Sequence, residues 1–108
     1  MKNQKITKKI INYIDIVLKY TINISYDEFE KNSMMVEACV FNLSQIGELV
    51  NRLDVEYMAK YPDVPWFKLR GLRNRIVHDY EGINLVLIWE IIDMDIKTLG
   101  ETLLKLIG

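Results

Sequence analysis

The spacing of apolar residues along the chain is the feature that most restricts its fold. In the last segment they recur every three or four residues, at Leu85, Ile88, Ile92, Ile96, Leu99, Leu103 and Leu106. The first segment repeats this pattern at Ile6, Ile10, Ile14, Val17 and Leu18, and we expect its helix to end near Tyr20. No stretch shows the two-residue alternation of a strand. The spacing predicts an all-α bundle of about four main helices.

The middle of the chain carries its own helix signals. Ser25 and Glu28 have the spacing of a capping box, which predicts a short helix there. We expect positions from about 33 to 53 to form a long helix with a narrow apolar seam, at Met35, Cys39, Asn42, Ile46, Leu49 and Leu53. Asn42 interrupts this seam, and a buried amide more often fixes helix register or a dimer contact than binds a ligand. Seams on two long helices of so small a chain favour a homodimer, although ordinary core is the simpler reading.

Prolines and a glycine divide the second half of the chain into separate predicted helices. Pro62 and Pro65 disfavour helix in the residues before them, so the preceding helix must stop, and Pro65 suits the first turn of the next helix. Gly82 gives a second break, and Asn84 is a good cap for the last helix.

Size and composition favour one compact cytoplasmic domain. The chain has 108 residues, half of them apolar, and we treat residues 1–108 as one domain. Cys39 is the only cysteine and has apolar neighbours, which indicates a buried thiol and a reducing compartment. The N-terminal lysines do not precede a clean apolar run, so we expect neither a secretory signal nor a membrane-spanning helix.

The charge pattern restricts nucleic-acid binding to a local site. The net charge is -1, which argues against a protein that coats nucleic acid. Lys68, Arg70, Arg73 and Arg75 nevertheless cluster in a stretch that lacks acidic residues between Asp63 and Asp79. A local contact with RNA is therefore the form that such binding would take.

The cluster continues into a run that holds the only histidine of the chain, His78. On a helical wheel, Leu69, Leu72, Ile76 and Tyr80 share an apolar arc, while Lys68, Gly71, Arg75 and Asp79 face the opposite way. Arg70, Asn74 and His78 form a polar stripe at one edge. Histidine changes charge near neutral pH, so His78 beside arginines is a candidate for proton transfer on a phosphate ester.

Simpler roles exist for the same residues. Arg73 falls among apolar positions and needs an anionic partner or a water-filled groove; a structural ion pair to Glu48 or Glu90 is as good a reading as phosphate binding. His78 fits a histidine near a helix C-terminus, and Tyr80 a core aromatic whose hydroxyl reaches water.

The run resembles a known family. Arg73, four residues, His78, one residue and Tyr80 match the Arg-x4-His-x-Tyr motif of the HepT-like branch of HEPN-domain proteins. The segments Phe41–Glu48, Tyr61–Trp66 and Leu69–Asn74 are also similar to that branch, so the resemblance covers most of the chain.

The resemblance implies an α-helical homodimer in which two motif helices meet across a cleft and cleave RNA without a metal ion or other cofactor. Such proteins are the toxin half of type VII toxin–antitoxin pairs, whose nucleotidyltransferase antitoxin transfers AMP to the motif tyrosine, here Tyr80. Arg73 and His78 would be catalytic, with Arg73 on the phosphate. Asn74 would orient the substrate or the imidazole, and Arg70 and Arg75 would steer the RNA backbone.

Other readings are weaker or belong to another class. One alternative is a non-catalytic helical partner or nucleotide-binding module of a nucleotidyltransferase, docked through the basic edge. A metal site at His78, Asp79 and Glu81 is disfavoured because adjacent helical residues point apart. Cys39 lacks the surroundings of a nucleophile. Asp93 and Asp95 are most simply a solvated face.

Overall fold

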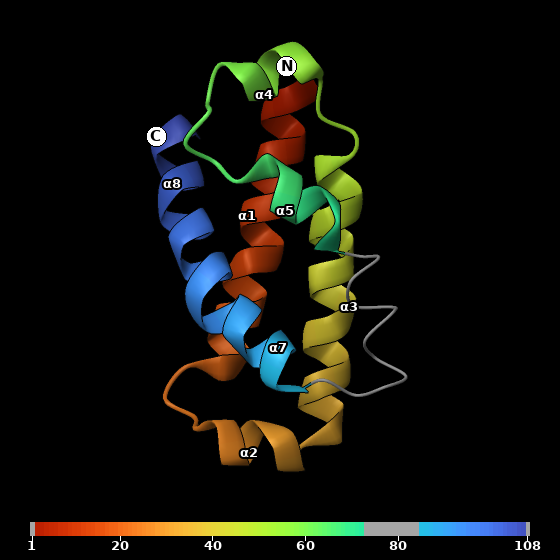
Figure 1. The fold of residues 1–108 in the computed structure, drawn as a ribbon, viewed down its shortest axis with the longest axis vertical. Helices are drawn as coiled ribbons and strands as arrows, with labels where there is room; N and C mark the ends of the chain where they lie inside the picture. The colour runs from red at the N-terminus through yellow and green to blue at the C-terminus, as the bar shows by residue number, and fades with distance from the viewer. Residues whose placement is uncertain (1, 73–84, 108) are drawn as a thin grey trace.

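The N-terminal half of the protein is a helical hairpin with a short helix in its turn (Figure 1). The computed structural model describes residues 2–72 and 85–107. Helix α1 (Lys2–Thr21) and helix α3 (Ser33–Val50) pack against each other, and α2 (Tyr26–Lys31) lies between them in the chain. Asn23 ends the α1 segment in the left-handed region, with φ 60°, which asparagine tolerates better than most residues. The end expected near Tyr20 is confirmed.

Helix α2 begins with the capping box that the sequence predicts. The Ser25 hydroxyl accepts a hydrogen bond from the Glu28 N–H (3.2 Å), and the Glu28 carboxylate accepts one from the Ser25 N–H (3.1 Å). The cap fixes where the helix starts, and Phe29 in its middle is fully buried.

Helix α3 is shorter and more deeply embedded than the sequence indicates. It ends at Val50, and the N–H groups of Arg52 and Leu53 bond to the carbonyls of Leu49 and Val50 in a tightened final turn. The prediction of a narrow apolar seam is wrong. The buried side chains form a broad face, at Val36, Cys39, Asn42, Leu43, Ile46, Leu49 and Val50. Since α3 packs against α1, α2 and α5 of its own chain, ordinary core explains this face.

A short corner turns the chain from α4 (Val55–Ala59) into α5 (Trp66–Arg70). The Trp66 indole N–H donates to the carbonyls of both Met58 and Tyr61 at 3.0 Å, which ties the two helices together. Pro65 precedes the first helical residue rather than occupying the first turn, so the predicted start is off by one position. The break before this helix is confirmed.

The C-terminal part of the chain consists of three consecutive helical segments: α7 (Leu85–Glu90), a π-helix η1 (Ile91–Ile96) and α8 (Lys97–Ile107). A regular helix over Ile91–Ile96 was expected, and this expectation is wrong; a π-helix has wider turns, with i→i+5 hydrogen bonds. The apolar set nevertheless faces inward, since Ile88, Ile92, Ile96, Leu99 and Leu103 are all buried. At Gly100, an added Cβ would lie 3.1 Å from the Ile14 Cγ2 atom, so glycine allows α8 to approach α1 closely.

Both described ends that flank residues 73–84 are anchored in the core. On one side, Leu69 and Leu72 are each 2% exposed. On the other, the Trp89 ring of α7 packs on Phe29 of α2 with a 5.0 Å centroid distance and on Tyr26 at 6.2 Å. Every regular element in residues 2–72 and 85–107 is a helix, which confirms the all-α class. None of these helices is long and apolar enough to cross a membrane.

Candidate functional site

The residues that the sequence selects lie at the C-terminal end of α5 and in the segment that follows. Arg70 is the last residue of α5 and is exposed. Arg73, Asn74, Arg75, His78 and Tyr80 lie outside the described residues. The roles assigned to them, like the expected break at Gly82 and cap at Asn84, stay predictions.

Helix α5 supports the predicted division into an inner and an outer face. Leu69 and Leu72 are buried, and α5 packs against α3. Phe67 and Lys68 point outward with Arg70. The wheel is therefore confirmed for buried Leu69 and Leu72 and for exposed Lys68, whereas Gly71, expected on the outer face, is half-buried.

Glu48 and Glu90 are the two carboxylates that the sequence offers as partners of Arg73. Glu48 is half-buried on α3, the helix that packs against α5, whereas Glu90 is exposed at the end of α7. The ion pair itself stays a prediction because Arg73 lies outside the described residues.

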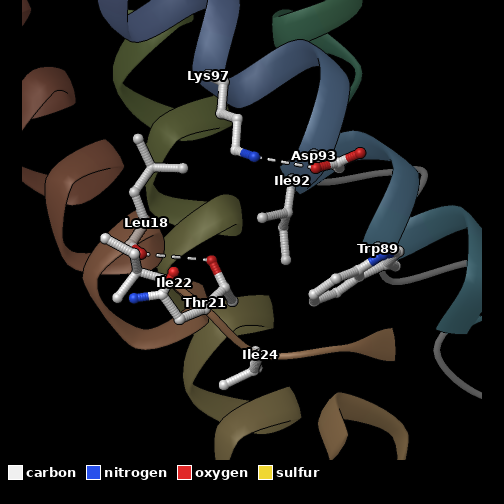
Figure 2. Close-up of a pocket in the computed structure, with 9 residues that line it drawn as sticks. Leu18, Thr21, Ile22, Ile24, Trp89, Ile92, Asp93 and Lys97 are labelled. Atoms are coloured by element: carbon white, nitrogen blue, oxygen red, sulfur yellow. Dashed lines mark hydrogen bonds and ion pairs between the residues drawn. The ribbon is translucent and has the colours of Figure 1, made fainter. Parts of the chain in front are cut away.

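A hollow of about 350 Å³ lies at a different place, between the end of α1 and the α7–η1 junction (Figure 2). Leu18, Ile22 and Ile24 face Trp89 and Ile92 across it. Several of its polar groups are already paired: the Thr21 hydroxyl donates to the Val17 carbonyl at 2.9 Å, and Lys97 pairs with Asp93 at 3.0 Å. The rest of its lining is mostly apolar, so the hollow does not have the make-up of a catalytic site.

Of the residues set aside in the sequence, Asp93 behaves as expected and Asp95 does not. Asp93 is exposed and paired with Lys97 along the helix, as a solvated face requires, while Asp95 is half-buried. Asn42 is buried, and its amide donates to the Ala38 carbonyl of its own helix at 2.7 Å. Within residues 2–72 and 85–107, no group of His, Cys, Asp and Glu side chains has the arrangement of a metal site.

Cys39 is a buried apolar residue, and not a nucleophile. Its side chain is 0% exposed on α3, and burial raises the pKa of the thiol to about 11. Only about one thiol in a thousand would be ionised at pH 8, and the thiolate is the reactive form.

We therefore expect Cys39 to resist alkylation by iodoacetamide in the native protein at pH 8 and to react rapidly in denaturant. Mass spectrometry of quenched samples measures the labelling. Native labelling at the rate of the denatured protein would contradict the assignment.

Comparison with known proteins bears directly on the motif. The model of the ribonuclease HepT-like family matches residues 10–106, which run from α1 into α8 and include the Arg-x4-His-x-Tyr run. The chain therefore belongs to the ribonuclease HepT-like family, and the resemblance drawn from the sequence is confirmed.

Several relatives are similar over most of their length. In Methanocaldococcus jannaschii, "Putative RNase MJ1216" is 32% identical, covering 91% of this chain and 81% of the relative. "Putative RNase MJ1380" from the same organism is 36% identical, covering 81% of this chain and 80% of the relative. "Probable ribonuclease HepT" of Thermococcus cleftensis is 24% identical, covering 83% and 82%. No solved structure matches the chain significantly.

Proposed function

We propose that the protein is a metal-independent endoribonuclease, the toxin of a type VII toxin–antitoxin pair. The observation that carries this proposal is family membership together with an intact Arg73-x4-His78-x-Tyr80 run. The exposed outer face of α5, which leads into that run, supports access of a large substrate. RNA cleavage inside the cytoplasm is the activity that follows.

The proposed chemistry divides one reaction among a few side chains. Metal-free RNA cleavage needs a base to remove the proton of the 2′-hydroxyl and an acid to protonate the leaving 5′-oxygen. The 2′-oxygen attacks phosphorus while the bond from phosphorus to the 5′-oxygen breaks. Arg73 binds the phosphate oxygens with its guanidinium fork, and His78 transfers protons. Asn74 orients the substrate or imidazole, and Arg70 and Arg75 attract the RNA backbone.

A homodimer supplies what one chain lacks. A single chain has one histidine and one histidine cannot easily act as base and acid at once, whereas two-fold pairing places two copies of His78 at one cleft. We propose that this cleft is the active site. The buried face of α3 packs against helices of its own chain, so it does not support a dimer. The dimer is proposed from the chemistry of the reaction alone.

The same site accounts for control by an antitoxin. We propose that a cognate nucleotidyltransferase joins the Tyr80 phenol oxygen to the α-phosphorus of ATP, with pyrophosphate as the leaving group. The product places a negative phosphodiester and a bulky nucleoside beside His78. The added charge and bulk would neutralise the arginines and fill the cleft.

The test is cleavage of a single-stranded RNA by the purified protein in EDTA. We expect discrete fragments that carry 2′,3′-cyclic phosphate ends, because the attacking oxygen belongs to the substrate. Activity that disappears in EDTA and returns with a divalent cation would contradict the metal-free mechanism. Tight binding to a nucleotidyltransferase with no cleavage of any RNA would favour the non-catalytic partner instead.

A further inference from the structure

Helix α5 exposes an aromatic side chain directly before the motif. Phe67 is 89% exposed, which is the largest exposure of any bulky apolar side chain in the described parts of the chain. It points away from the core because Leu69 occupies the inner face of the same short helix. In Figure 1, α5 crosses the front of the bundle beside α3, with nothing of the described chain in front of it.

Cations stand on both sides of the Phe67 ring. At about 100° per residue, Lys68 lies to one side of Phe67 and Arg70 to the other, and both are exposed. Gly71 follows one turn later and has no side chain to cover the ring. The sequence contains no acidic residue between Asp63 and Asp79, and exposed Lys68 and Arg70 bring positive charge to the outer side of α5.

An exposed ring between cations is the arrangement that binds single-stranded nucleic acid. Unpaired bases stack on aromatic faces, and neighbouring cations hold the phosphates that connect them. A duplex keeps its bases stacked on one another and has no free face to offer. We propose that Phe67, Lys68 and Arg70 form a stacking platform that holds an unpaired base of the RNA next to the cleavage site. This inference rests on the proposed ribonuclease function.

A second exposed phenylalanine shows why the surroundings matter. Phe41 on α3 is 59% exposed, but its neighbours one turn away are Glu37, Ala38, Ser44 and Gln45, so a carboxylate and no cation accompanies the ring. Phosphates would be repelled there. Phe41 is therefore a matched control of the same residue type with the opposite electrostatic setting.

Binding is measured by fluorescence anisotropy with a labelled oligouridylate in EDTA, using His78→Ala as the parent so that the RNA is not cut. We expect Phe67→Leu, which keeps an apolar side chain but no π-face, to weaken binding about ten-fold. Phe67→Trp should restore the affinity, and Phe41→Leu should leave it unchanged. Lys68→Ala should lower the salt dependence of log K by about 0.7, the value for one lost contact to a single strand. A duplex of equal length should not distinguish Phe67→Leu from the parent.

In the enzyme that retains His78, Phe67→Leu should raise KM with little change in kcat, because the ring binds a base away from the reacting phosphate. Equal affinity of Phe67→Leu and the parent, or an equal loss in Phe41→Leu, would overturn the platform. A Phe67→Leu protein that sediments differently from the parent but binds RNA equally well would also overturn the platform, because the ring would then belong to a protein interface. Cleavage in EDTA combined with unchanged affinity of Phe67→Leu would leave the ribonuclease standing and remove only the platform.

Discussion

Substitution of His78 by alanine should reduce the rate of RNA cleavage at least about 100-fold, the usual contribution of a general acid or base. In a dimer the substitution removes both imidazoles, so neither the proton transfer from the 2′-hydroxyl nor that to the leaving oxygen is assisted. Gel analysis of single-turnover cleavage in EDTA gives the rate. Helical circular dichroism and the thermal midpoint should match the wild type, since the buried core residues of the described helices are unchanged.

Two controls separate chemistry from structure in this experiment. Added imidazole should restore part of the cleavage in His78→Ala, which a purely structural role would not allow. Lys105→Ala, an exposed change near the end of α8, should retain the full rate. Undiminished cleavage by His78→Ala would exclude the assigned site.

Replacement of Tyr80 by phenylalanine should abolish modification by the proposed antitoxin while RNA cleavage continues at close to the wild-type rate. The substitution removes the oxygen that accepts the AMP group and keeps the ring. The proposed cleavage reaction does not use that oxygen. Intact-mass measurement after incubation with the cognate nucleotidyltransferase and ATP should show one added AMP on the wild-type chain and none on Tyr80→Phe.

The comparison requires another tyrosine in the same protein. Tyr20 on α1 is 45% exposed, so its hydroxyl is open to any promiscuous transferase. Tyr20→Phe should be modified and silenced like the wild type. If Tyr80→Phe were still modified and silenced, the switch would lie at another residue.

Local signals in the sequence account for much of the fold. The capping box at Ser25 and Glu28 forms as expected because both of its hydrogen bonds lie within four residues of chain. The division of α5 into buried Leu69 and exposed Lys68 follows from helical spacing alone. Such features need no knowledge of distant contacts.

The features that depend on packing were not predictable from spacing. The positions Ile88, Ile92 and Ile96 suit a regular helix, and four-residue steps do not reveal the wider turns of the π-helix. The breadth of the buried face of α3 likewise depends on its having neighbours on more than one side. Phe67 is adjacent to Trp66 in sequence, yet one is exposed and the other holds the α4–α5 corner.

The candidate site is predictable from the sequence to a different extent than the fold. Arg73 and His78 were selected by residue chemistry and by likeness to a family, and the family is now established for the chain. Spacing alone left simpler roles open for both residues. In the proposed dimer their arrangement depends on how two copies meet, which no pattern within one chain encodes.

The central claim is that two copies of His78 act together in one cleft, and a mixed dimer tests it most directly. Co-expression of wild-type and His78→Ala chains with different affinity tags allows the dimer with a single imidazole to be isolated. If one histidine acts as base and its mate as acid, this mixed dimer should cleave RNA in EDTA at about 1% of the wild-type rate or less. A mixed dimer with about half of the wild-type activity would contradict the account, because each chain would then carry a complete site of its own.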